Sequence, residues 1–392
     1  MTIERMTAPA ASPASPTRDE RPTPPANRRR LTVRRLIAFV VVLLVLLTGG
    51  SYVRALTYPG SAPFQVRSVE WVRDHGGNGL VDRIENWYYS SHAPRGSAPD
   101  PAALPAAPAA GVRAAVRAPA ALPLLAGHTP VRAEGAWVAG RRDPAGLPAI
   151  YTTFVRPDPA HPSVVAGVAW IRAGDTRAHL VPGTVEPAGA RWPSAARVAT
   201  ADVPALVATF NSGWKMAGAR GGFYLAGRTA RPLRVGAASV VIDDAGRATV
   251  GQWGRDVSMT SHVVAVRQNL ALIVDGGRPV PGLASNKGAQ WGNARNQYQY
   301  TWRSGIGTDR AGDLVYVGGP ELTLRALATA LADAGAVRGM ELDIHPSTVS
   351  FASWAPAPTG RVVPTNLLPT FDRPADRYLA PDQRDFFYLT LR

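Results

Sequence analysis

The sequence contains no cysteine among its 392 residues. Disulfide bonds, thiolate metal sites and a cysteine nucleophile are therefore excluded. The seven histidines lie far apart along the chain, and none belongs to a short metal-ligand pattern such as HxH or HExxH. The sequence thus gives no indication of a zinc enzyme. We expect no cofactor, and leave a divalent cation open.

A long apolar run stands near the N-terminus. Residues 36–47 are apolar without interruption, and no charged residue occurs from 36 to 53, which is about the minimum length for a bilayer span. Five arginines precede the run, so the positive-inside rule predicts a single-pass protein of the cell membrane with a cytoplasmic N-terminus and an extracytoplasmic C-terminal domain. A cleaved signal peptide is the other interpretation, and it exports the same domain.

Composition divides the chain into five parts. Residues 1–30 contain few apolar side chains that could form a core, which predicts a disordered cytoplasmic tail. A transmembrane signal-anchor helix is expected to follow over 31–53. Helical spacing of apolar residues predicts juxtamembrane amphipathic helices over 54–92. Alanine and proline dominate a linker over 93–125, which leaves 126–392 as the folded domain.

Lysine is nearly absent, because the basic residues are 41 arginines and 2 lysines. The formal net charge is +15, and residues 36–392 keep +10 of it. Nucleic acid is not expected as a partner of an exported domain. Two interpretations of the charge remain: attraction to a phosphate-bearing glycan, a cell-envelope polymer or lipid head groups, or a codon usage that favours arginine.

In the folded part, residues 126–392, the pattern predicts mainly strands separated by turn residues, which indicates an α+β class and one strand-rich domain. One amphipathic helix is predicted over 321–334, with Gly335 as its stop, inside a strand-helix-strand unit. Hairpin loops are expected at 244–246 and 309–312. Strands are expected at 149–157, 164–173, 176–183, 205–211, 237–243, 248–254, 270–277, 303–309 and 313–319.

The stretch GMELDIHPSTVSF, residues 339–351, concentrates polar groups in an apolar segment. Alternation along a strand gives an apolar face of Met340, Leu342 and Ile344. It gives a polar face of Glu341, Asp343 and His345. Two carboxylates on such a face, with their Cα atoms about 6.6 Å apart, repel each other, which raises one pKa and suits acid/base chemistry. The alternative interpretation is a structural network with arginines, in which His345 caps the strand end.

Several motifs occur together in residues 200–355. They are ATFNSGW, RSGIGTDRAGDLVYV, LTLRALATALADAGAVRGMELD and the following ST. In order and spacing they resemble the phosphodiester glycosidase family. That family has an Asn-Gly-Gly-Phe-like turn after a strand, an Arg-Thr-x-x-Gly strand, a helix, and then Leu-Asp-Gly-Gly-x-Ser.

The resemblance assigns motif positions to particular residues. The matching positions are Asn211, Gly213, Arg303, Gly307, Asp343 and Ser347. Departures occur at Ser212, Trp214, Ser304, Glu341, Ile344 and His345. The last two replace a glycine pair, and losing those glycines denies the backbone its close approach to a ligand.

The resemblance implies hydrolysis of a sugar-1-phosphodiester bond in a glycan, such as an exopolysaccharide, or in a cell-envelope polymer. Asp343 is then the expected base or nucleophile, with Glu341 or His345 setting its protonation state. We expect Arg303 to clamp the phosphate.

Three further residues complete the predicted site. Asn211, with Gly213 in the same turn, and Ser347 are expected to position the sugar. Lys215 follows the Asn211 turn, and is either a second phosphate contact or a solvated loop lysine.

Two other functions remain open. One is a non-catalytic cell-wall or polysaccharide-binding module on a membrane stalk, which would use the same pocket and the basic surface. The other is a metal-dependent phosphodiesterase with Asp343 and His345 as ligands, although two ligands fall short of a metal site.

Overall fold

The computed structural model divides the chain into two compact units, 1–56 and 57–392. Residues 1–25 of the expected tail and part of the expected linker lie outside the described part of the chain. The structure describes residues 26–58, 62–94, 96–106, 118–187, 192–285, 289–292 and 299–392.

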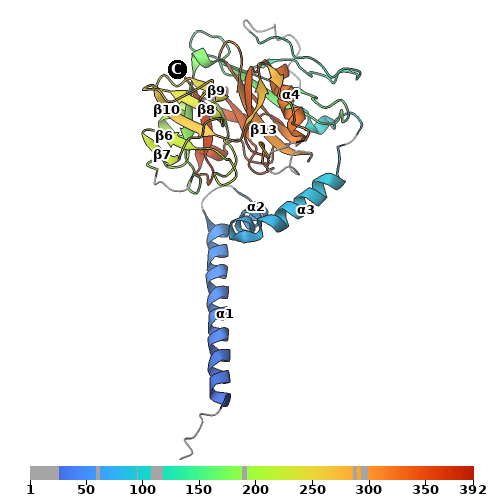
Figure 1. Ribbon diagram of the computed structural model, residues 1–392. Helices are drawn as coiled ribbons and strands as arrows, with labels where there is room; N and C mark the ends of the chain where they lie inside the picture. The colour runs from blue at the N-terminus through green and yellow to red at the C-terminus, as the bar shows by residue number, and fades with distance from the viewer. Residues whose placement is uncertain are drawn as a thin grey trace, which may run out of the picture. The chain divides into compact units, whose positions relative to one another are not determined.

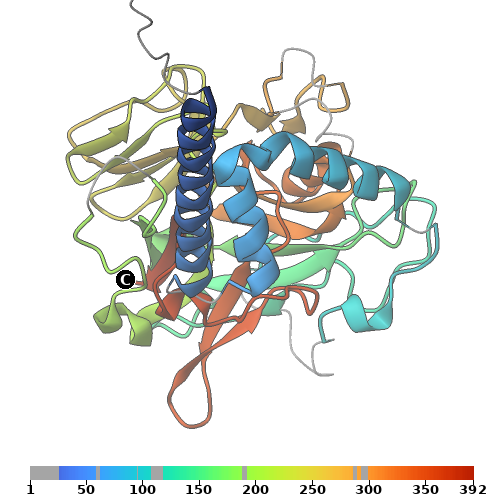
Figure 2. The same ribbon diagram turned by 90° about the horizontal axis from the view of Figure 1, so that it is seen from below.

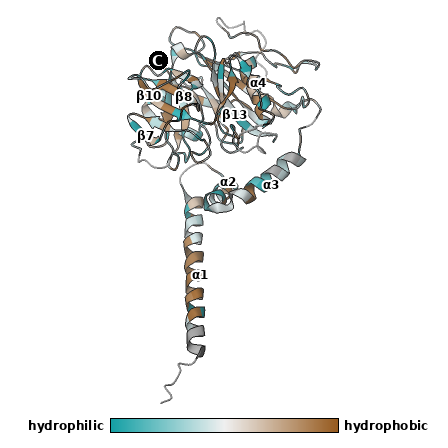
Figure 3. Cartoon of the chain, viewed as in Figure 1, coloured by the Kyte–Doolittle hydropathy of each residue, from teal (hydrophilic) through white to brown (hydrophobic). Residues whose placement is uncertain are grey.

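The described part of the first unit forms one long helix, α1, Ala26–Thr57. Its stretch Thr32–Thr57 has 26 residues and contains an 18-residue window with a mean hydropathy of 2.5 and no buried residue, so by length and composition it can cross a membrane. Figure 3 shows the apolar middle of this helix in brown. The helix begins within the expected tail and extends beyond the expected end of the span at residue 53.

The second unit opens with two short helices, α2 at Phe64–Val72 and α3 at Asn78–Ser91. A turn labelled η1, Arg73–Gly77, joins them, and Gly76 has a φ of 87° that breaks the helical path. Both helices lie across one face of the strand-rich body (Figures 1 and 2).

Within the described residues, the strand-rich body contains three sheets whose named strands pair antiparallel. The largest sheet has the order β1 (Val138–Ala139), β2 (Ile150–Val155), β3 (Ala166–Ile171), β14 (Leu314–Leu322), β13 (Thr301–Thr308), β15 (Arg338–Glu341), β11 (Leu272–Asp275) and β12 (Arg278–Pro279). A second sheet has the order β7 (Arg228–Arg231), β6 (Phe223–Leu225), β10 (Val263–Gln268), β8 (Ala238–Asp243) and β9 (Ala248–Gln252). The third has the order β17 (Val362–Asn366), β16 (Phe351–Pro356), β5 (Leu206–Asn211), β18 (Phe386–Leu391) and β4 (Thr176–Val181).

The α+β class and the strand-helix-strand unit are confirmed. Each of the nine expected strand segments contains an observed strand, and both expected hairpin loops are present between paired strands. Gly246 and Gly312 supply the positive φ values, 75° and 89°, that these tight loops need. Short 3₁₀ turns connect other elements, at Pro101–Ala103, Ala173–Asp175, Thr200–Ala205 and Arg377–Leu379.

The predicted helix is α4, Leu324–Asp333, between β14 and β15. It starts later than expected because β14 continues through Leu322, and the hydroxyl of Thr323 caps it by accepting the Ala326 N–H at 3.1 Å. Gly335, with a φ of 95°, ends it as predicted.

Aromatic side chains join the sheets in the interior. Phe210 of β5 stacks on Phe351 of β16 and Phe387 of β18, with ring centroids 5.7 and 5.5 Å apart. Tyr316 of β14 packs against both Phe210 and Phe351, so the largest sheet and the third sheet share one core. A second apolar cluster lies beneath α4. The end of β5 lies beside β13, since Asn211 donates to Ser304 at 2.9 Å, and β13 pairs in turn with β15.

Gly307 allows β13 and β15 to approach closely. A Cβ atom there would lie 2.6 Å from the carbonyl oxygen of Arg338 and 2.7 Å from the Cβ of Ala336. We predict that Gly307→Ala lowers the free energy of unfolding by about 1–3 kcal/mol, as overpacking does. Denaturant unfolding measures this change.

Gly174→Ala is the matched control, since a Cβ there meets nothing within 4 Å. Its effect should stay within about 0.5 kcal/mol. Equal stability of the Gly307→Ala variant and the parent would contradict the packing described.

Candidate functional site

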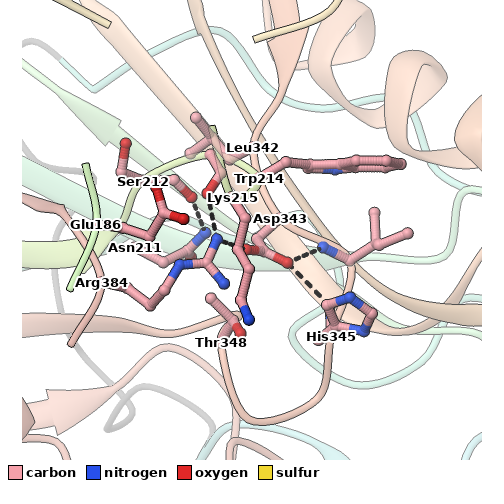
Figure 4. Close-up of polar contacts among 12 residues, drawn as sticks. Glu186, Asn211, Ser212, Trp214, Lys215, Leu342, Asp343, His345, Thr348 and Arg384 are labelled. Carbon is pink, nitrogen blue, oxygen red and sulfur yellow. Dashed lines mark hydrogen bonds and ion pairs between the residues drawn. The ribbon is translucent and has the colours of Figure 1, made fainter. Parts of the chain in front are cut away.

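A cavity of about 300 Å³ lies where the chain after β5 and β15 meets the segment before β18 and the helices α2 and α3. Figure 4 shows side chains from several of these segments converging on Asp343. Trp214 and Ile344 form apolar parts of the wall. The charged or titratable lining consists of Glu70, Arg73, Asp74, Asp82, Lys215, Asp343, His345 and Arg384.

Asp343 lies two residues beyond the end of the strand β15. The alternation expected through His345 stops at Glu341, because the Asp343 carboxylate folds back onto its own backbone. Its Oδ1 accepts the N–H groups of Ile344 at 2.7 Å and His345 at 3.3 Å. The turn closes when Thr348 donates its N–H to the His345 carbonyl at 2.9 Å. Asp343 is thus fixed at the start of a turn, with Ile344 and His345 both facing the cavity.

Arg384 holds the other oxygen of this carboxylate. Its Nη2 donates to Asp343 Oδ2 at 2.9 Å and to the carbonyl of Gly213 at 2.9 Å. The two side chains are only 11% and 2% exposed, so the pair is largely screened from water. Burial acts to lower the pKa of Arg384, but the charges of Asp343 and Glu70 outweigh it and the pKa is raised.

Lys215 forms ion pairs with Glu70, in direct contact, and with Asp74 at 2.7 Å. Burial acts to raise the pKa of Glu70, yet Lys215 and Arg384 lower it to about 2. Of the two readings of Lys215 offered by the sequence, the structure places it at the cavity wall rather than in a solvated loop.

The cationic side chains that line the cavity are already paired. Arg73 pairs with Glu85 at 2.6 Å and with Asp82 at 3.7 Å. The lining therefore holds four carboxylates against three cationic side chains, and each of those cations has a carboxylate partner.

Arg303 and Glu341 lie outside the cavity. Their side chains are fully buried and form an ion pair with Nη1 and Oε1 2.5 Å apart, while the Arg303 Nε donates to the Leu322 carbonyl at 2.8 Å. Burial raises the pKa of Glu341 to about 6 against the lowering effect of Arg303, and the Asp343 charge adds to the rise. The phosphate clamp predicted for Arg303 does not fit this placement, because its guanidinium does not reach the cavity.

Asn211 is likewise a framework residue. Its amide nitrogen donates to Ser304 Oγ at 2.9 Å and to the Ser212 carbonyl at 2.8 Å. Its oxygen accepts from the Tyr316 hydroxyl and from the Ser350 N–H, both at 3.0 Å. All four of its hydrogen-bonding positions are used, so none is left to position a sugar.

Gly213 and Ser347 act through their backbones. A Cβ at Gly213 would lie 2.9 Å from the Cγ of Asn269, so only glycine fits there. The carbonyl of Ser347 accepts from Arg373 at 2.9 Å and from Arg377 at 3.0 Å, and Ser347 lines a neighbouring small cavity rather than the one at Asp343.

Several residues of the site were not predicted from the sequence. Arg384 stands in a loop, PDQRD, that carries no recognisable motif. Glu70, Arg73, Asp74 and Asp82 belong to helices far away in the sequence. Only the charged face of those predicted amphipathic helices could have indicated them.

Two further findings concern other sites. A larger cavity of about 700 Å³ borders α4 near Arg156, Asp158 and Asp333, and none of the predicted site residues lines it. Within the described residues, no group of three or more histidine, aspartate or glutamate side chains is arranged to hold a metal ion.

No family model matches this sequence, and no curated protein matches it. Among solved structures, the chain is similar to the zebrafish N-acetylglucosamine-1-phosphodiester alpha-N-acetylglucosaminidase catalytic domain auto-inhibited by its pro-peptide, with a TM-score of 0.42, 14% identity, and coverage of 64% of this chain and 87% of that one. A protein from Synechocystis has a TM-score of 0.35 and 13% identity, with coverage of 62% of this chain and 62% of that one. A putative exported protein from Burkholderia pseudomallei has a TM-score of 0.30 and 14% identity, with coverage of 58% of this chain and 74% of that one. At these scores, membership of the phosphodiester glycosidase family stays a prediction from the sequence motifs.

The raised pKa of Glu341 predicts a pH dependence of stability. Between pH 4.5, the usual pKa of a glutamate, and about pH 6, Glu341 keeps a proton in the folded state that it has lost in the unfolded state. The contribution of Glu341 to stability is therefore full below pH 4.5 and is lost as the pH rises through about 6, amounting to about 2 kcal/mol. Unfolding free energies measured from pH 4 to 7 should show this decline.

Glu341→Gln should remove that part of the pH dependence. Glu134→Gln, which also breaks a buried ion pair, with Arg156 at 2.8 Å, is the matched control. If the unfolding free energy of the Glu341→Gln variant declines with pH as steeply as that of the parent, Glu341 does not titrate in this range.

Proposed function

We propose that this chain is a membrane-anchored extracytoplasmic hydrolase. In this proposal it cleaves the bond between the anomeric carbon of a sugar and a phosphodiester, in a glycan or a cell-envelope polymer, with Asp343 as the reacting carboxylate. One observation carries the proposal: Asp343 is held by Arg384 and two backbone N–H groups at the wall of a cavity with further cations. The sequence motifs around Asn211, Arg303 and Asp343 support the same reaction class.

The chemistry of the bond fits such a site. Water adds to the anomeric carbon, and the bond to the phosphate oxygen breaks. The departing phosphate monoester is a good leaving group, so strong protonation by a general acid is less important than in ordinary glycosidases. Asp343 either takes the proton of the attacking water or forms a glycosyl ester that water then hydrolyses.

The phosphate needs cations, and Lys215 and Arg73 take the place of Arg303 in this proposal. Both line the cavity, and both can exchange a carboxylate partner for phosphate oxygens. Arg384 positions Asp343 rather than binding phosphate, since its Nη2 is engaged with Asp343 and Gly213. His345 and Ile344 narrow the cavity where the family has glycines, which favours a different substrate from that of the family's typical members.

A non-catalytic polysaccharide-binding module is the second candidate. The observation that favours it is that each lysine and arginine lining the cavity is already paired with a carboxylate. A neutral or weakly charged saccharide could bind in such a cavity without displacing these carboxylates from the cations, whereas a phosphate group would have to compete with them.

Turnover of a sugar-1-phosphodiester by the full chain in detergent decides between these functions. We predict that Asp343→Asn lowers the rate of sugar release by about 10²-fold or more, as loss of a base or nucleophile does. Asp309→Asn is the matched control, because Asp309 also accepts two backbone N–H groups in a loop, at 2.9 Å each, but lies outside the cavity.

Full sugar release by the Asp343→Asn variant would overturn the assignment of Asp343. Saccharide binding without turnover in the parent chain would support the binding module. Loss of turnover on addition of a chelator would indicate the metal-dependent reaction.

A further inference from the structure

The helix α3 carries an apolar stripe that no part of the described chain covers. Its residues follow the spacing i, i+4, i+7, i+8, which places them on one face. Their exposed fractions are 58% for Leu80, 56% for Ile84, 69% for Trp87 and 50% for Tyr88. Four large apolar side chains on one face of a 14-residue helix are unusual in contact with water, and they indicate an interaction surface.

The opposite face of α3 is engaged with the rest of its unit. Asp82 and Glu85 pair with Arg73, and Asp82 lines the cavity. Tyr89, on the same face, is partly buried. These contacts fix the rotation of α3 about its own axis, so the apolar stripe is held outward rather than being free to turn inward.

Chain connectivity limits what can cover the stripe. Six residues separate the end of α1 from the start of α2, a distance of at most about 20 Å even when fully extended. If α1 crosses a bilayer, α2 and α3 are therefore tethered close to its surface. Tryptophan and tyrosine are enriched at such interfaces, and the exposed Arg83 next to the stripe suits lipid head groups.

We propose that the face of α3 formed by Leu80, Ile84, Trp87 and Tyr88 docks on the lipid bilayer into which α1 inserts. The stripe lies at the boundary between head groups and acyl chains, as in interfacial amphipathic helices. Because Asp82 on the other face of α3 lines the cavity, this docking places the candidate site beside the membrane surface.

The absence of cysteine makes the test direct. The full chain is reconstituted into vesicles of phosphatidylcholine and phosphatidylglycerol, with one nitroxide label introduced through Ile84→Cys. Val235→Cys, at a side chain that is 82% exposed and outside α3, is the matched control. Val42→Cys reports whether α1 is inserted, and Leu80→Cys repeats the measurement one turn earlier on α3.

Relaxation of each label by oxygen, which concentrates in lipid, is compared with relaxation by a water-soluble nickel chelate. The proposal predicts that oxygen dominates at Ile84, Leu80 and Val42, and that nickel dominates at Val235. Nickel dominating at both Ile84 and Leu80 would overturn it. Protection of those two labels from both reagents would also overturn it, since the stripe would then be covered by protein, such as a second copy of the chain.

Discussion

The ion pair between Arg384 and Asp343 is the contact on which the candidate site depends. Arg384 precedes β18, Asp343 follows β15, and the Gly213 carbonyl that Arg384 also binds follows β5. One guanidinium thus joins strands of two different sheets at the point where the cavity opens. Breaking such a largely buried pair leaves an uncompensated charge, which is strongly destabilising.

A layer of buried polar contacts stabilises this junction. Asp385, the neighbour of Arg384, pairs with Arg267 at 2.7 Å, and Arg267 in turn donates to the Trp214 carbonyl at 2.5 Å. Asn269 binds the carbonyls of Glu341 and Leu342, at 2.8 and 3.0 Å. The backbone at Trp214 and at Glu341 and Leu342 is therefore fastened to side chains of the strand β10 and the residue that follows it.

Many of the strands and α4 could be predicted from the sequence because period-two and helical patterns and turn glycines are local signals, whereas β10, β16 and β18 were not among the expected segments. The candidate site could be predicted only in part. Alternation correctly separated Glu341 from the apolar face, but it could not show that this second face is also buried and that Arg303 is turned inward toward Glu341. Likewise, Arg384 reaches Asp343, and Glu70 reaches Lys215, only through the three-dimensional path of the chain, which no local pattern encodes.

A double-mutant cycle on Asp343→Asn and Arg384→Met tests the role of the ion pair most directly. The free energy of unfolding is measured for the full chain, both single variants and the double variant. The account predicts a coupling energy of about 1–3 kcal/mol, because either single change already removes the shared contact. Effects of the two changes that add within about 0.3 kcal/mol would contradict it.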